Sequence, residues 1–287
     1  MTVEEPLYIL KLSCADTIGL VHAVAGFLTR SGCNIVTSAQ FGDPESGRFF
    51  MRVAFVPADP ATALADLARG FEAVAGRHAM DWSLHDARRR ARALILVSRF
   101  GHCLNDLLYR SRSGGLSLDV AAVVSNHRDF EGLAAGHGVP FHHLPVARET
   151  KAEQEARLLG LIEETGADLV VLARYMQVLS DGLCRRLAGR AINIHHSFLP
   201  SFKGAAPYTQ AHVRGVKLIG ATAHYVTPEL DEGPIIEQDV QRVSHEHAPA
   251  DLAAIGRDVE SAVLARAVRF HVEHRVLLNG ARTVVFR

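Results

Sequence analysis

The sequence has no excess of charge of either sign. Its 287 residues carry 31 Lys and Arg against 31 Asp and Glu, so the formal net charge is zero when histidine is neutral. Proteins that bind nucleic acid through its phosphates need a basic surface. The balance therefore argues against a protein whose main task is electrostatic binding of nucleic acid or another polyanion.

Long apolar runs are also missing, although 48% of the residues are hydrophobic. No stretch approaches the roughly 18 uninterrupted apolar residues of a membrane-spanning helix. The first residues include Glu4, Glu5 and Pro6 rather than a basic and apolar signal segment. We therefore expect no membrane segment and a cytoplasmic location. At roughly 100–200 residues per domain, the length fits one large or two ordinary domains.

Cysteine is scarce and scattered. The four cysteines are Cys14, Cys33, Cys103 and Cys184. No C-x-x-C spacing occurs, which argues against a disulfide framework and against a zinc knuckle. Histidines cluster at 142–143 and 245–247, but neither cluster has helical i,i+4 spacing or a nearby cysteine. We expect no metal site.

Residues 1–86 alternate between strand-like and helix-like patterns. In chain order these are strand 7–13, helix 18–29, strands 35–41 and 49–56, helix 61–75 and strand 80–84. The order βαββαβ is that of the ferredoxin-like fold. A stretch with four arginines follows at 88–92, so we place a domain boundary between residues 86 and 87.

Residues 87–287 form the second predicted domain. Its expected strands are 93–98, 119–125, 140–144, 168–172 and 191–195, with helical segments between them. This alternation favours a Rossmann-like α/β domain with a mostly parallel sheet. In such sheets ligands bind beyond the carboxyl ends of the strands, which directs attention to the segments after Leu172 and Ile194.

The segment around Ile194 has residue types suited to acyl chemistry. Asn193 and His195 stand two positions apart at the end of an expected strand, so their side chains project to the same side. An amide donor and an acid/base group can then face one carbonyl. Spacing alone is equally consistent with two polar residues in a surface loop. If the strand continues, His196 points to the opposite side as a structural hydrogen-bonding residue.

A second segment makes the pattern specific. Residues 193–200 read N-x-H-x-S-x-L-P, and Asp231 stands in the L-D-E-G-P turn of residues 230–234. These motifs resemble those of the folate-dependent formyltransferase family. The closer resemblance covers essentially the whole chain and is to the hydrolytic branch, the formyltetrahydrofolate deformylase family. In that branch the βαββαβ unit looks like an ACT domain and the rest like a formyltransferase domain.

The resemblance implies an enzyme that hydrolyses 10-formyltetrahydrofolate to formate and tetrahydrofolate. This reaction balances the one-carbon folate pool and supplies formate for purine synthesis. Asn193 would donate to the developing oxyanion, His195 would act as acid/base, and Asp231 would orient His195 and the attacking water. The folate is the substrate, and no cofactor is required.

Transfer of the formyl group to an amine is the alternative reaction. Transferases of the family hold a substrate phosphate with a glycine-rich turn after the first strand of this domain, where backbone N–H groups form an anion nest. The chain reads S-R-F-G-H at residues 98–102, with one glycine. This departure favours water as the acceptor. A non-catalytic folate or amino-acid sensor is a third hypothesis, against which the intact Asn193, His195 and Asp231 argue.

The resemblance also assigns a folate pocket. One wall holds the pterin and consists of Met176, Gln177, Val178 and Leu179. The opposite wall consists of Pro228, Glu229 and Leu230. On pattern alone, Met176 and Leu179 are also typical of an ordinary core at helical spacing.

ACT domains often bind small amino acids at the interface between two copies. The matching D-x-x-G-L pattern here is formed by Asp16, Gly19 and Leu20. Glycine or methionine is the expected effector, and pairing of ACT sheets would make the protein a homo-oligomer, either a dimer or a tetramer. The simpler alternative is a tight turn in which Asp16 or Thr17 caps a helix.

Overall fold

The computed structural model describes residues 6–147, 149–199 and 207–287. The chain divides into two units, one formed by the residues up to Arg90 together with Glu273–Arg287, and the other by Ala91–Val272. Pro200, the last residue of the N-x-H-x-S-x-L-P motif, lies outside the described residues. In the described ranges, no helix is long and apolar enough to cross a membrane.

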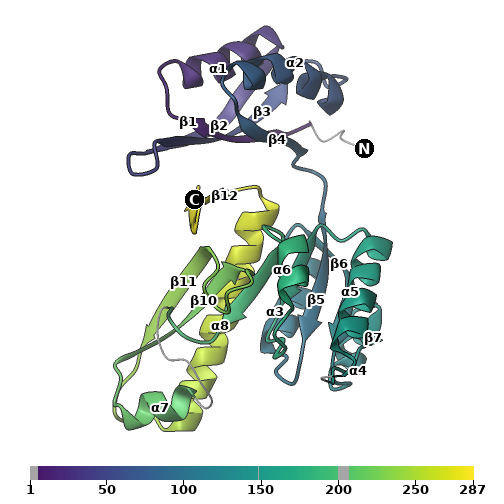
Figure 1. Cartoon of the computed structure of the whole chain (residues 1–287), viewed down its shortest axis with the longest axis vertical. Coiled ribbons are helices and arrows are strands. Elements are labelled where there is room, and N and C mark those ends of the chain that lie inside the picture. The colour runs from purple at the N-terminus through teal and green to yellow at the C-terminus, as the bar shows by residue number, and fades with distance from the viewer. Residues whose placement is uncertain (1–5, 148, 200–206) are drawn as a thin grey trace. The chain divides into compact units, whose positions relative to one another are not determined.

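The first unit is an antiparallel sheet of strand order β2-β3-β1-β4, with α1 and α2 on one face (Figure 1). Its elements are β1 (Tyr8–Ala15), α1 (Leu20–Arg30), β2 (Cys33–Asp43), β3 (Arg48–Pro57), α2 (Leu64–Arg77) and β4 (Asp81–Asp86). The ferredoxin-like order predicted for the N-terminal domain is confirmed.

Alternate residues of the central strands build the core beneath these helices. Leu10 and Leu12 of β1 are almost fully buried and pack in one cluster with Phe71 of α2 and Leu20 of α1. Since side chains of a strand alternate between its faces, residues two apart reach the same helix-covered side. This apolar face holds the helices on the sheet.

The last residues of the chain belong to the first unit. β12 (Val276–Asn279) and β13 (Arg282–Val285) form an antiparallel hairpin. Asn279 Nδ2 donates to Asp43 Oδ2 at 2.7 Å, and Arg282 pairs with the same carboxylate at 3.1 Å. The sequence analysis placed residues 273–287 in the second domain, whereas the structure places them in the first unit. Local patterns miss the contact because Asn279 and Asp43 are 236 positions apart.

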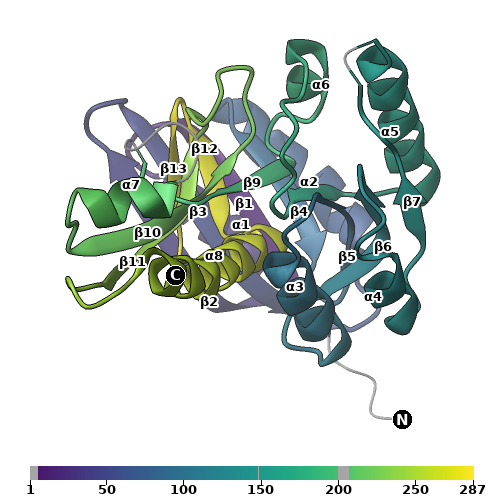
Figure 2. The ribbon, with the colours of Figure 1, turned by 90° about the horizontal axis from the view of Figure 1, so that it is seen from below.

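The second unit is a sheet of order β11-β10-β9-β8-β5-β6-β7 with helices on both faces (Figure 2). The strands from β9 to β7 in this order run parallel, whereas β10 is antiparallel to both of its neighbours. The elements are β5 (Ala91–Val97), α3 (His102–Arg112), β6 (Leu118–Ser125), α4 (Glu131–Gly136), β7 (Phe141–His143), α5 (Lys151–Thr165), β8 (Leu169–Leu172), α6 (Asp181–Arg186), β9 (Ala191–His195), α7 (Pro207–Val213), β10 (Leu218–Tyr225), β11 (Ile235–Arg242) and α8 (Pro249–Val272). The predicted Rossmann-like, mostly parallel sheet is confirmed.

The antiparallel strands β10 and β11 were not predicted. β10 is buried along almost its whole length, so it shows no alternation of polar and apolar residues. α8 packs against β10 and lies beside α3 on one face of the sheet, while α5 and α6 lie on the other (Figure 2). The parallel strands β5, β8 and β9 therefore end at one edge, where α/β sheets bind ligands.

Replacing Asp43 with alanine should destabilise the first unit, because Ser46, Asn279 and Arg282 lose their shared acceptor. The Ser46 hydrogen bond, followed by that of Asn279, lowers the pKa of Asp43 from 3.8 to about 2. The contribution is therefore complete above pH 3.8 and is lost as the pH falls through about 2. At pH 7, thermal unfolding should show a midpoint several degrees lower in Asp43→Ala.

The control is Glu45→Ala, which removes an exposed ion pair with the same Arg282. Exposed pairs contribute little, so this variant should unfold at nearly the temperature of the parent protein. Equal midpoints for Asp43→Ala and Glu45→Ala would contradict the role given to Asp43.

Candidate active site

β9 and β10 bring polar side chains together at the edge of the second sheet. Asn193 and His195 are two positions apart on β9 and project to one face. In the antiparallel register, His224 of β10 lies opposite Asn193, and Thr222 lies opposite His195. The strand pairing therefore adds His224 to the pair that the sequence predicted.

His224 orients the amide of Asn193. His224 Nδ1 lies 2.9 Å from the backbone oxygen of Tyr225, and because a carbonyl oxygen only accepts, Nδ1 carries the hydrogen. The Nε2 atom of the neutral ring then accepts from Asn193 Nδ2 at 3.2 Å. An amide NH2 group has two hydrogens, so Asn193 keeps a second one to donate to another acceptor.

Asp231 joins the site from the loop after β10. Its Oδ2 atom lies 3.3 Å from His195 Nδ1, and its Oδ1 atom lies 3.7 Å from His224 Nε2. The hydrogen bond from His195 is the largest of the effects that hold the pKa of Asp231 far below its ordinary value despite partial burial. The carboxylate is therefore ionised at neutral pH and fixes the orientation of His195.

The turn around Asp231 depends on a close backbone contact. Asp231 has a φ of 58°, in the left-handed region that few residues other than glycine adopt. Tyr225 N donates to Pro234 O at 2.9 Å, which presses the turn against the end of β10. A Cβ atom at Gly233 would lie 1.7 Å from Tyr225 O. Only glycine fits there, which explains its place in the L-D-E-G-P motif.

A cavity of about 270 Å³ opens beside these side chains. It is lined by the predicted catalytic residues and by every residue predicted for the folate pocket, namely Asn193, His195, Asp231, Met176, Gln177, Val178, Leu179, Pro228, Glu229 and Leu230. The fold thus brings together all the residues that the sequence assigned to the site of the second domain.

The loop after β8 supplies an apolar wall of this cavity. Met176 and Val178 are more than half exposed, at 56% and 58%, so they are not core residues, whereas Leu179 packs partly against the core. Met176 N donates to Ser98 Oγ at 3.0 Å and ties the loop to the segment after β5. Exposed apolar side chains at the rim of a cavity suit a flat, largely apolar ring.

Two histidines of the cavity were not predicted as site residues. His224 requires the register of β9 and β10, although a lone histidine in the apolar run 218–225 is a signal for it. His196 was expected to point away from His195 if the strand continued. Because β9 ends at His195, strand alternation does not govern His196, and the two rings stack with centroids 4.8 Å apart. Both histidines line the cavity.

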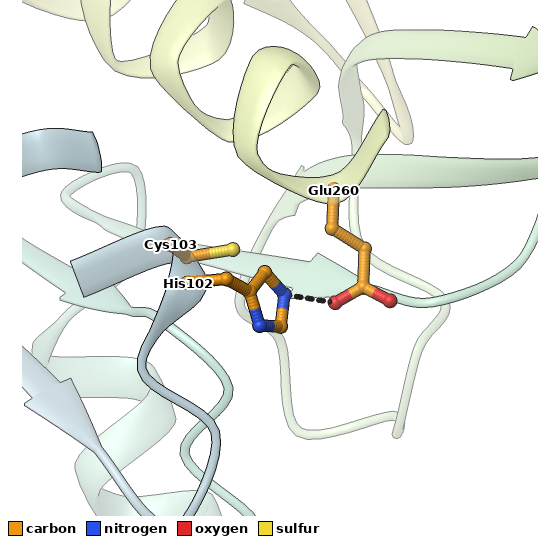
Figure 3. Close-up of side chains that lie close together, drawn as sticks. All are labelled: His102, Cys103 and Glu260. Atoms are coloured by element: carbon orange, nitrogen blue, oxygen red, sulfur yellow. Dashed lines mark hydrogen bonds and ion pairs between the residues drawn. The ribbon is translucent and has the colours of Figure 1, made fainter. Parts of the chain in front are cut away.

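A cluster next to the cavity contains the donor types of a metal site. Ligand atoms of His102, Cys103 and Glu260 lie within 4.8 Å of one another (Figure 3). Glu260 is, however, already bonded to His102 Nε2 at 2.8 Å and to the Tyr208 hydroxyl at 2.8 Å. Arg174 lies 3.3 Å from Glu260, and burial raises the pKa of Cys103. These contacts suit a hydrogen-bonded network around a glutamate and disfavour a bound cation.

The residues predicted for an effector site lie in the first unit. Asp16 and Gly19 belong to the loop between β1 and α1, and Asp16 N donates to Gly47 O. Gly19 is the N-cap of α1 with a φ of 94°, and no side chain caps this helix, so Asp16 and Thr17 are not caps. Leu20 is buried in the core, so its side chain does not face a ligand.

Both units match known families. Residues 91–268 match the family model described as Formyl transferase, and residues 8–69 match that of the ACT domain. A formyltetrahydrofolate deformylase of Corynebacterium sp. (strain P-1) is 54% identical over 99% of this chain and 99% of its own length.

One solved structure matches essentially the whole chain, and another matches about two thirds of it. The crystal structure of formyltetrahydrofolate deformylase from Burkholderia mallei ATCC 23344 has a TM-score of 0.95 and 55% identity, and it covers 98% of this chain and 100% of that chain. Glycinamide ribonucleotide transformylase 1 from Symbiobacterium toebii has a TM-score of 0.65 and 33% identity, over 69% of this chain and 95% of that chain. Similarity to the transformylase is therefore partial, whereas similarity to the deformylase is complete.

Replacing Gly233 with alanine should displace the turn that carries Asp231, because the new Cβ would overlap Tyr225 O. Overpacking of this kind costs about 1–3 kcal/mol, so the unfolding temperature should fall. A crystal structure of Gly233→Ala should show the Asp231 carboxylate moved away from His195. Gly132→Ala in α4 is the control, because a Cβ there meets nothing within 4 Å. If Asp231 kept its position in Gly233→Ala, this account of the turn would be wrong.

Proposed function

Because this chain belongs to the formyltetrahydrofolate deformylase family, whose members match it over essentially its whole length, we propose that 10-formyltetrahydrofolate is hydrolysed in the cavity beside Asn193, His195 and Asp231. The observation that carries this proposal is the meeting of His195 and Asp231 at 3.3 Å on a wall of that cavity, next to an oriented amide. The products are formate and tetrahydrofolate, and the folate is the substrate rather than a resident cofactor.

The pterin ring of the substrate lies between the two walls of the cavity. Met176 and Val178 offer exposed apolar surface on one side, and residues 228–230 form the other. Burying a flat ring between such surfaces supplies binding energy in proportion to the apolar area removed from water. That energy holds the formyl group next to the polar residues at the edge of the sheet.

Asn193 stabilises the charge that develops on the formyl oxygen. Its amide gives one hydrogen to His224 and directs the other at the substrate. A donor oriented before the reaction needs no reorganisation as the carbonyl becomes an oxyanion, which is why such donors accelerate acyl transfer.

His195 acts as the acid/base group. Its Nδ1 atom faces the ionised Asp231, so the hydrogen of the neutral ring resides there and Nε2 is the basic nitrogen. Nε2 is buried and has no hydrogen-bond partner among the described residues. It takes a proton from the attacking water as the water oxygen bonds to the formyl carbon, and returns it to N10 as the C–N10 bond breaks. Asp231, bonded at Nδ1, orients the His195 ring for this step.

The reaction returns tetrahydrofolate to the folate pool and releases formate. A one-carbon unit held on folate thereby becomes free formate that purine synthesis can use. This metabolic role is part of the proposal and rests on membership of the deformylase family.

The purified protein should release formate from 10-formyltetrahydrofolate with no amine present. Asn193→Ala should lower the turnover number by about 10²- to 10³-fold, because a preorganised oxyanion donor is lost. Asp231→Asn should lower it as well and change the pH profile, because His195 loses its ionised partner. Asn105→Ala, an exposed position of α3 outside the cavity, is the matched control.

Formate should be measured in parallel with candidate amine acceptors in the mixture. A parent protein that releases no formate above the level of Asn193→Ala, but forms a formylated amine, would replace the hydrolase by the transferase. Full turnover in Asp231→Asn with an unchanged pH profile would remove Asp231 from the mechanism.

A small amino acid is the proposed effector of the first unit, through the loop that contains Asp16 and Gly19. Gly19 adopts a left-handed backbone that other residues reach only with strain, and Asp16 offers a carboxylate near exposed Ile18. The homo-oligomer expected from paired ACT sheets stays a prediction, which the molar mass in solution will test.

Isothermal titration with glycine and with methionine should show saturable binding in the parent protein, weakened at least tenfold in Asp16→Ala. Glu72→Ala, an exposed acidic residue of α2, is the charge-matched control and should bind as the parent does. Absence of binding at millimolar ligand would leave the first unit without this effector role.

A further inference from the structure

His196 follows the proposed acid/base residue directly and shares its environment. The rings of His195 and His196 stack with centroids 4.8 Å apart and an interplanar angle of 26°. Both residues line the cavity that holds Asn193 and Asp231. The mechanism derived above gives His196 no task.

Unpartnered buried nitrogen atoms gather at this cavity. In the described part of the chain, buried side-chain atoms that lack a hydrogen-bond partner occur at His137, Gln154, Arg174, His195 and His196. Arg174, His195 and His196 line the one cavity. Because Arg174 Nε lies 3.3 Å from Glu260 Oε2 in an ion pair, the atoms left without a partner there are the Nε2 atoms of the two stacked histidines. A buried polar atom without a partner costs about 1–3 kcal/mol unless water or a ligand satisfies it. Their concentration marks a polar binding position for a small molecule.

The wall behind His196 is a closed network around Glu260. The carboxylate of Glu260 accepts a hydrogen bond from His102 Nε2 at 2.8 Å (Figure 3). It also accepts one from the Tyr208 hydroxyl at 2.8 Å, and Arg174 lies 3.3 Å away. The ring of Tyr208 lies 6.5 Å from that of His196. The polar atoms of Glu260, His102, Tyr208 and Arg174 bond to one another. The network therefore lies next to His196 and leaves its Nε2 atom without a partner.

The surroundings also keep His196 uncharged at neutral pH. Burial, followed by the positive charge of Arg174, lowers its pKa to about 4, and the opposing effects of Glu260 and Asp231 are smaller. A neutral imidazole can accept or donate one hydrogen bond at Nε2, according to its tautomer. It can therefore hold a water molecule without competing for its proton.

We propose that Nε2 of His196 binds the water that attacks the formyl carbon, together with Nε2 of His195. The inference rests on the proposed function and adds a water-binding residue to it. A water that donates one hydrogen to His195 still has a second hydrogen and its lone pairs to satisfy, and buried waters usually have two to four polar partners. Nε2 of His196, as an acceptor, takes the second hydrogen, which leaves a lone pair of the water oxygen free to attack the carbonyl carbon.

The atoms of the step balance with no further reactant. The water oxygen bonds to the formyl carbon, its proton passes to His195 and then to N10, and the C–N10 bond breaks to give formate and tetrahydrofolate. His196 makes a hydrogen bond throughout and gains or loses no proton over the cycle. Its contribution is therefore to the position of the nucleophile.

Formate release should be measured for His196→Ala and His196→Gln beside the parent protein. Loss of a positioning contact should lower kcat of His196→Ala by about 10²-fold, while KM for 10-formyltetrahydrofolate stays within about threefold, because the pterin walls are untouched. The glutamine amide can also bond a water molecule, so His196→Gln should recover part of kcat. His137→Ala is the matched control, since His137 has a buried unpartnered nitrogen at the end of α4, outside the cavity.

Hydroxylamine distinguishes a water-binding role from a structural one. It is a small nucleophile that can attack in place of a water molecule that is no longer held. The ratio of N-formylhydroxylamine to formate, corrected for the reaction without protein, should rise at least tenfold in His196→Ala relative to the parent. Binding of tetrahydrofolate, measured by titration, should match that of the parent and show that the cavity is intact.

The inference is overturned if His196→Ala keeps the parent kcat, if its defect lies in KM, or if formate and N-formylhydroxylamine fall together. It is also overturned if His137→Ala shows the same defect. These outcomes differ from a failure of the proposed function, in which the parent protein itself would release no more formate than Asn193→Ala.

Discussion

The antiparallel pairing of β9 with β10 is the constraint on which the site depends. β9 ends the run of parallel strands, and its register with β10 sets His224 against Asn193. The turn that follows β10 then returns over the end of β9 and carries Asp231 to His195. One set of backbone hydrogen bonds thus positions an amide donor, an imidazole and a carboxylate that come from separate stretches of the chain. A shift of one residue would turn every side chain of β10 to the other face.

Two carboxylates with similar surroundings serve different purposes in the second unit. Burial raises the pKa of Asp231 and of Glu260, whereas hydrogen bonds from histidine, with Arg174 beside Glu260, more than offset it and leave both below their ordinary values. Asp231 faces the cavity, and Glu260 is buried within a bonded network. Both carboxylates raise the pKa of His196, but burial and the charge of Arg174 lower it more, so His196 is uncharged at neutral pH.

Local sequence patterns were enough to predict the fold class of both domains. Alternation in the N-terminal strands and the regular exchange of strand and helix after residue 90 revealed both domain types, because each pattern arises from neighbours in the sequence. The resemblance of the two motifs then named the residues that line the cavity. β10 was missed because burial on both faces removes alternation. The strand 191–195 was predicted with the bounds that β9 has, so strand alternation could not place the side chain of His196 beyond its end. The C-terminal hairpin was assigned to the second domain because its bond to Asp43 crosses almost the whole chain. Each miss concerns a contact made by tertiary structure.

The hairpin at the C-terminus makes the first unit discontinuous, with the second unit inserted into its sequence. The backbone oxygen of Glu273 accepts hydrogen bonds from Arg52 of β3. The chain therefore contacts the sheet of the first unit again directly after α8 ends. During synthesis on the ribosome, β1 to β4 emerge first but lack β12 and β13 until the entire second unit has been made. Domains usually fold in the order in which they are made. Here the unit that starts first is completed last, and a nascent chain that stops before residue 273 has the four-stranded sheet but lacks the hairpin that belongs to the same unit.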